Sequence, residues 1–114
     1  MIILLCGSRY ASPTRVAELA RPYLNKGDTL IHGDAPGADQ AAKILGEELD
    51  ITVIPFPAEW AKYGKAAGPI RNKKMLTEGK PDLILAYPIG ESKGTRNMMD
   101  QGKDIKTINL KDTK

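Results

Sequence analysis

The stretch Leu30-Ile31-His32-Gly33-Asp34-Ala35-Pro36-Gly37-Ala38-Asp39 decides the fold of this chain. A short apolar run reaches a glycine, turns through small residues, and enters a segment whose apolar residues recur at helical spacing. A strand, a glycine-rich turn and a helix start, in that order, aim unpaired backbone N–H groups at an anion. The stretch is therefore either an ordinary tight turn before a capped helix or part of a binding site.

Five residues of this stretch are candidate site residues. Gly33 and Gly37 let the backbone approach a ligand without a Cβ in the way. Asp34 and Asp39 are short acidic groups that can hold the hydroxyls of a sugar or simply cap the helix. His32, the only histidine, ends the predicted strand, where a satisfied polar residue, a ligand contact and a general base all remain open.

The rest of the chain continues the same alternation. Strands are predicted at residues 2–6, 29–32, 51–55, 82–87 and 106–110, and helices at 13–24, 38–49, 69–78 and 95–102. Alternating strands and helices imply right-handed crossovers and a parallel sheet that is covered on both faces. We therefore predict one domain over residues 1–114, of the α/β class: a Rossmann-like three-layer sandwich with a five-stranded, mostly parallel sheet.

Residues 56–68 form the least regular segment and contain the only tryptophan, Trp60. Trp60 and Tyr63 either anchor this segment onto the domain or stack on the base of a nucleotide. In the helix that follows, Ile70, Met75 and Leu76 are expected to face the core.

Two further turns follow the strands at 2–6 and 82–87, so all three turns should meet at one edge of the sheet, where ligands bind in such folds. Gly90, Gly94 and Thr95 precede a helix and form the candidate phosphate cradle. Arg9 and Arg71 offer fork-shaped donors to a phosphate or carboxylate, although each alone is also typical of a solvated surface.

The composition of the chain and the motifs that it lacks exclude several classes of protein function. A net charge of +3 is weak for a dedicated duplex-DNA binder, so nucleic acid is not an expected partner. The single cysteine, Cys6, lies in an apolar run and is predicted to be a core residue; it excludes an internal disulfide and a cysteine-based zinc cage. There is no Walker A motif, metal-spaced cluster or nucleophile–His–acid set, so neither metal nor cofactor is expected. No apolar stretch is long enough to span a bilayer, and we expect a soluble, cytoplasmic protein.

Several short motifs, in the same order along almost the whole chain, together resemble one family. They are Gly7-Ser8-Arg9, His32-Gly33 with Gly37-Ala38-Asp39, Pro57-Ala58-Glu59-Trp60, Gly64-Lys65-Ala66-Ala67-Gly68-Pro69-Ile70-Arg71-Asn72 with Met75, Pro81-Asp82 and Gly94-Thr95. This series resembles the YspA-like (cpYpsA-related) family of the SLOG superfamily. The resemblance implies a Rossmann-like fold that binds a nucleotide or nucleotide-derived small molecule at the C-terminal edge of the sheet, as sensor, carrier or sequestering module. It adds Gly7, Ser8, Trp60 and Asn72 to the candidate ligand-binding residues.

The resemblance to the enzymes of that superfamily is partial. Arg71 with Met75 is similar to the Arg-Lys-x-x-Met helix of the Lonely Guy phosphoribohydrolases, and Gly94 and Thr95 match their phosphate loop. The catalytic glutamate of that loop falls on Met98, which can neither stabilise an oxocarbenium ion nor move a proton. The resemblance therefore favours a binding module without a catalytic residue. The alternative is a nucleotide hydrolase that cleaves an N-glycosidic or phosphate bond, with a carboxylate supplied from another position by Asp34, Asp39 or Glu91.

Self-association is a further implication of the resemblance. Proteins of this superfamily often pair through the helices that flank the site, and in this chain those helices carry Met75, Met98 and Met99. A homodimer or higher homo-oligomer is therefore expected, with the methionines either at the contact or in the core.

Overall fold

The computed structural model describes residues 1–33, 36–90 and 92–112, in which strands and helices alternate. The strands are β1 (Ile2–Gly7), β2 (Thr29–Gly33), β3 (Thr52–Phe56), β4 (Leu83–Tyr87) and β5 (Thr107–Asn109). They form one sheet in the order β3-β2-β1-β4-β5, and every neighbouring pair is parallel. The predicted α/β class and five-stranded sheet are confirmed, with a sheet that is parallel throughout.

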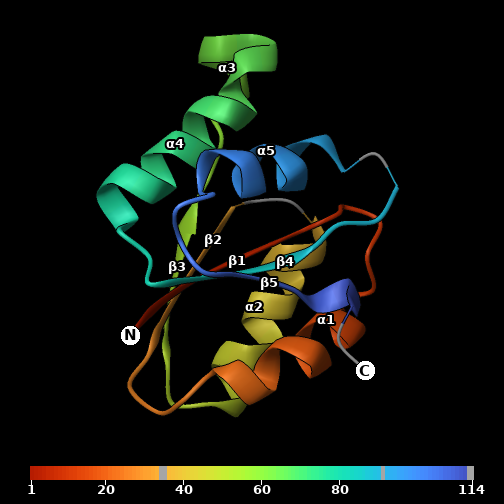
Figure 1. Cartoon of the computed structure of the whole chain (residues 1–114), viewed down its shortest axis with the longest axis vertical. Helices are drawn as coiled ribbons and strands as arrows, with labels where there is room; N and C mark the ends of the chain where they lie inside the picture. The colour runs from red at the N-terminus through yellow and green to blue at the C-terminus, as the bar shows by residue number, and fades with distance from the viewer. Residues whose placement is uncertain (34–35, 91, 113–114) are drawn as a thin grey trace.

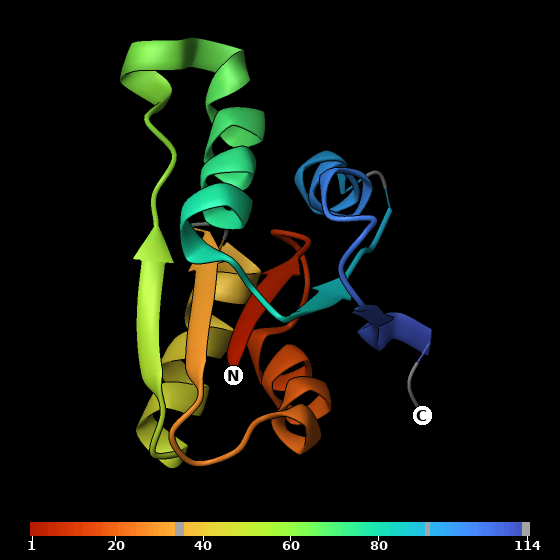
Figure 2. The same cartoon turned by 60° about the vertical axis from the view of Figure 1, so that its left-hand side comes forward.

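The helices cover both faces of this sheet (Figures 1 and 2). Helices α1 (Pro13–Ala20) and α2 (Pro36–Glu48) pack on one face, and α4 (Ala67–Gly79) and α5 (Lys93–Gln101) pack on the other. The short helix α3 (Trp60–Tyr63) precedes α4. Three 3₁₀ turns complete the described elements: η1 (Arg21–Tyr23), η2 (Gly64–Ala66) and η3 (Leu110–Asp112).

The strands have apolar cores on both sides, which explains why they read as continuous apolar runs. Because side chains alternate along a strand, Ile3 and Leu5 pack on the α1/α2 side, whereas Leu4 packs on the α4/α5 side. The second core also contains Ile84, Met75 and Met98, all with at most 1% of their surface exposed. Met75 and Met98 are therefore interior residues and offer no apolar surface to a second copy.

Several boundaries differ from the predicted ones for local reasons. The first helix begins as predicted, with the Ser12 Oγ accepting a hydrogen bond from the Arg15 backbone N–H at 3.3 Å. It ends at Ala20 instead of residue 24, since Pro22 has no N–H to continue the helical ladder. Helix α2 begins at Pro36, two residues earlier than predicted, with proline in the first turn.

The segment 56–68 is more regular than predicted, because it contains α3 and η2 and because α4 already begins at Ala67. The helix after β4 begins at Lys93, and the last strand ends at Asn109. The prediction that Ile70 faces the core is wrong, because this residue is 41% exposed. Ile70 and the buried Met75 are five positions apart, so they lie on different faces of α4.

The connections place a crevice at the carboxyl end of the sheet. β1 leads to α1 on one face, whereas its neighbour β4 leads to α5 on the other. The chain thus turns in opposite directions from two adjacent strands. This is the topological switch point at which α/β sheets bind ligands.

Candidate functional site

A cavity of about 1100 Å³ lies at this switch point. Its wall is built from the turn after β1, the end of β2 with the start of α2, the segment 60–75, and the turn from β4 into α5. The three glycine-containing turns therefore converge as the chain order predicted. The predicted site residues in the wall are Gly7, Ser8, Arg9, Gly33, Trp60, Arg71, Asn72, Gly90, Gly94 and Thr95.

Other residues of the central stretch lie outside this wall. His32 is buried, its Nδ1 donates a hydrogen bond to the Gly33 carbonyl at 2.6 Å, and the same nitrogen lies 3.6 Å from the Asp39 carboxylate. At Gly37 a Cβ would lie 2.5 Å from the Ser8 carbonyl oxygen, so this glycine serves the packing of α2 against the turn after β1. Asp34 lies outside the described residues.

Ser8 organises the turn after β1 from inside the wall. It is only 4% exposed, its Oγ accepts a hydrogen bond from the Tyr10 N–H at 3.2 Å, and its N–H donates to the Tyr87 carbonyl at 3.0 Å. The second bond ties the turn after β1 to the end of β4. Ser8 thereby fixes the turn that carries Arg9 into the cavity.

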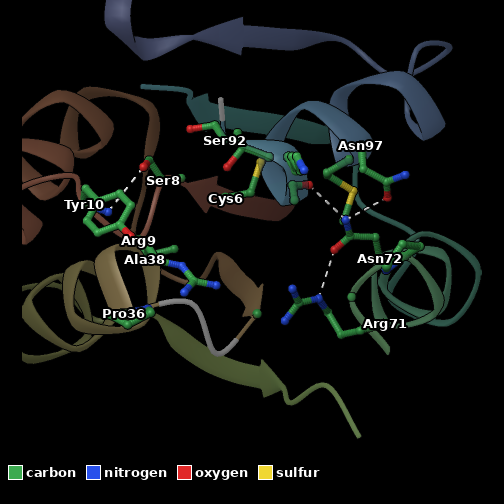
Figure 3. A pocket seen from close by; sticks show the side chains of 18 of the residues that line it. Cys6, Ser8, Arg9, Tyr10, Pro36, Ala38, Arg71, Asn72, Ser92 and Asn97 are labelled. Atoms are coloured by element: carbon green, nitrogen blue, oxygen red, sulfur yellow. Dashed lines mark hydrogen bonds between the residues drawn. The ribbon is translucent and has the colours of Figure 1, made fainter. Parts of the chain in front are cut away.

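Two guanidinium groups reach into the cavity from different elements (Figure 3). The Arg9 side chain is exposed, and within the part of the chain that the structure describes it has no hydrogen-bond or ion-pair partner. Arg71, on α4, is held more firmly: Nε donates to the Asn72 Oδ1 at 2.9 Å and Nη1 to the Phe56 carbonyl at 3.4 Å. A phosphate or carboxylate can therefore bind between Arg9, whose side chain can adjust, and Arg71, whose side chain is fixed.

The first turn of α5 supplies backbone donors to the same cavity. Ser92 adopts φ +38° before the helix, and its Oγ is bonded to the backbone N–H and carbonyl of Ile89, so it does not cap α5. Among the described residues, the N–H groups of Gly94 and Thr95 have no protein acceptor. A Cβ at Gly94 would meet no atom within 4 Å. Within the described residues, the helix end is therefore open toward the cavity, and these two N–H groups can donate to an anion.

Two lysines in the wall were not anticipated from the sequence. Lys65 and Lys93 line the cavity together with Arg9 and Arg71, and the lining residues that the structure describes include no aspartate or glutamate. Both lysines resemble ordinary surface residues in the sequence; the available signals were the position of Lys93 directly before Gly94 and the place of Lys65 in the motif that ends in Arg71-Asn72. The four cations favour a ligand with several negative charges.

The floor of the cavity is apolar and contains sulfur side chains. Cys6, Met75 and Met98 line it from β1, α4 and α5. Cys6 is half-buried, and desolvation raises the pKa of its thiol to about 12, although the positive charge of Arg71 acts in the opposite direction. The thiol is therefore neutral at physiological pH, and Met98, at 1% exposure, supplies no acid–base group.

Trp60 lies at the edge of the cavity and is 52% exposed. Its ring contacts the start of α4, where a Cβ at Gly68 would lie 3.5 Å from the ring edge. It is thus not a core anchor, and its ring is accessible to a ligand. Tyr63 is 38% exposed and lines a different, smaller groove beside β3.

The described residues contain neither a metal-binding cluster nor a membrane-spanning helix. No group of three His, Cys, Asp or Glu side chains within residues 1–33, 36–90 and 92–112 is arranged to hold a metal ion. No described helix is both long and apolar enough to cross a bilayer.

The chain is similar to a phage protein. No family model matches the chain. The chain is 34% identical to the Gene 61 protein of Mycobacterium phage D29 over an alignment of 121 residues, which covers 96% of each of the two chains. Because the identity extends over nearly the full length of both, this chain belongs to the same protein family as the Gene 61 protein of Mycobacterium phage D29.

Proposed function

We propose that this protein binds a nucleotide or nucleotide-derived small molecule in the cavity at the switch point, as a sensor, carrier or sequestering module. One observation carries the proposal: the Arg9 and Arg71 guanidinium groups and the open N-terminus of α5 face one cavity. Fork-shaped cations and unpaired backbone N–H groups are the donors that phosphate oxygens prefer. The resemblance to the SLOG superfamily is a second support.

The shape of the cavity suits the parts of such a ligand. Ligand cavities are usually about 300–1,000 Å³, so about 1100 Å³ leaves room for a whole nucleotide. The phosphates would lie between Arg71 and the first turn of α5. The base would lie against the accessible ring of Trp60, where aromatic stacking is favourable.

Binding without turnover fits the wall better than hydrolysis. A phosphoribohydrolase needs a carboxylate at the reacting carbon, and the corresponding position holds the buried Met98. The described lining residues include no histidine, aspartate or glutamate that could replace it, and Asp34 and Glu91 lie outside the described residues. Overnight reactions with AMP, CMP, GMP and UMP should therefore release no free base on chromatography. Base formed in proportion to protein, and lost in Arg71→Ala, would favour the hydrolase instead.

Two measurements test binding directly. Mass spectrometry of small molecules released on denaturation should detect a nucleotide-like compound if one co-purifies. In thermal melts with mono-, di-, cyclic and ADP-ribose-type nucleotides at millimolar concentration, at least one compound should stabilise the protein. A ligand at 100 times its Kd adds about 2.7 kcal/mol, which raises Tm by roughly 4–8 °C in a domain of this size. If no compound shifts Tm and nothing co-purifies, the proposed function is wrong.

A further inference from the structure

We infer that Asn72 is a positioning residue that couples Arg71 to the first turn of α5, and that it does not bind the ligand itself. The inference rests on the proposed function for its effect on affinity. The effect of Asn72 on the position of the Arg71 side chain does not depend on the proposed function, and it is tested separately below.

The amide of Asn72 is fully engaged within the protein. Asn72 is 4% exposed, its Oδ1 accepts from the Arg71 Nε at 2.9 Å, and its Nδ2 donates to the Gly94 carbonyl and to the Asn97 Oδ1, both at 3.0 Å. Only one orientation of the amide fits, because an arginine Nε can only donate and the two oxygens can only accept. Both amide hydrogens are used, so the side chain has no donor left for a ligand (Figure 3).

These three bonds join the two halves of the anion site. One partner is the guanidinium of Arg71 on α4, and another is the Gly94 carbonyl in the first turn of α5, next to the open N–H groups. A phosphate that meets both halves needs them at a fixed separation. One buried amide sets that separation, and a small displacement of either half weakens contacts that depend on geometry.

Gln101 provides a matched control, because it also links α4 and α5 by an amide. Its Nε2 donates to the Pro69 carbonyl at 3.2 Å and to the Asn97 Oδ1 at 2.6 Å, and the residue lies outside the cavity wall. Loss of Gln101 removes a helix-to-helix link of the same chemistry. A general loosening of α4 against α5 would therefore affect both variants, whereas positioning of Arg71 would affect Asn72→Ala alone.

The first experiment needs no ligand. The Arg71 Nε–Hε cross-peak in a ¹H–¹⁵N spectrum can be assigned by its absence in Arg71→Lys. In the wild-type protein and in Gln101→Ala this proton should exchange slowly with water, because it is bonded to the Asn72 Oδ1. In Asn72→Ala it should shift and exchange faster. An unchanged position and exchange rate in Asn72→Ala would overturn the inference.

The second experiment measures the Kd of AMP, ADP and inorganic pyrophosphate by calorimetry. For each probe that the wild-type protein binds, Asn72→Ala should raise Kd by about tenfold or more, the effect of losing one contact to a charged group, and Gln101→Ala should leave Kd within about twofold. Equal Kd values for the wild type and Asn72→Ala would overturn the inference while leaving the proposed function intact. Failure of the wild type to bind any of the three probes would count against the proposed function. In that case the Arg71 Nε–Hε cross-peak alone would test whether Asn72 positions Arg71.

If Asn72→Ala does not fold, Asn72→Asp is the second variant that tests the same coupling. The carboxylate keeps an acceptor for the Arg71 Nε but removes both donors to α5 and faces the Gly94 carbonyl with a negative charge. The Arg71 cross-peak should then persist while Kd for the same probes still rises by about tenfold or more, because the link to α5 is lost. An unchanged Kd in this variant would contradict the coupling.

Discussion

Gly33 and Arg71 lie so close together that a Cβ at position 33 would displace the Arg71 guanidinium group. A Cβ there would lie 2.6 Å from the Arg71 Cζ and 3.1 Å from its Nε. Gly33 ends β2, whereas Arg71 lies on α4, which follows α2, β3 and α3 in the chain. The glycine therefore leaves the space through which the guanidinium reaches the cavity.

Gly33→Ala should weaken nucleotide binding without unfolding the protein. The new Cβ would meet the end of the flexible Arg71 side chain, which can move away. Gly33 has no positive φ, so the substitution does not strain the backbone. We expect the free energy of unfolding to change by less than about 1 kcal/mol and Kd to rise about tenfold. Calorimetry and denaturant melts measure the two quantities. In an Arg71→Ala background the alanine should have no further effect on Kd, and an additive effect would refute this mechanism.

Gly94→Ala should change stability and affinity in opposite directions. The new Cβ meets no atom within 4 Å and the backbone is helical, so alanine should stabilise the free protein by about 0.5–1 kcal/mol. The same methyl group enters the cavity beside the open N–H groups and should weaken binding. Denaturant melts of the free protein and titration with the ligand separate the two effects. A destabilised variant with unchanged affinity would show that Gly94 serves packing.

Arg9→Ala should weaken binding with little effect on the fold, because the described residues offer its side chain no hydrogen-bond or ion-pair partner. Loss of one contact to a charged group should raise Kd about tenfold, more for diphosphates than for monophosphates, and less at high salt. The matched control is Arg15→Ala, since Arg15 is exposed on α1 and pairs with Glu18 at 2.9 Å, outside the cavity wall. Equal losses in both variants would indicate a general charge effect.

Cys6 should be unreactive in the folded protein. Burial raises the pKa of its thiol from the ordinary 9.0 to about 12, so at pH 8 native Cys6 should react with iodoacetamide at least roughly a hundredfold more slowly than in urea. The raised pKa also makes stability fall between about pH 9 and 12, because only the unfolded thiol ionises there. Alkylation rates and melts of Cys6→Ser test both effects. Equal alkylation rates in the two states would contradict the assigned pKa.

The order of strands and helices and the location of the cavity could be read from the sequence. Continuous apolar runs such as residues 2–6 are required of strands that are buried on both faces, and the glycine-containing turns mark their carboxyl ends. Parallel strands bring those ends to one edge regardless of packing detail. Arg9, Gly94 and Thr95 therefore meet in space even though they lie in segments far apart in the chain.

The role of each side chain was decided only by the tertiary structure. His32 and Gly37 belong to the same short stretch as Gly33, yet His32 bonds to the Gly33 carbonyl, Gly37 lets α2 pack on the turn after β1, and Gly33 makes room for Arg71. Asn72 binds Arg71 and α5, and Lys65 and Lys93 join the cavity wall. A local sequence pattern specifies which residues end a strand or begin a helix. Which group each side chain meets depends on contacts between segments that are distant in sequence, and these form only when the two helix layers pack on the sheet.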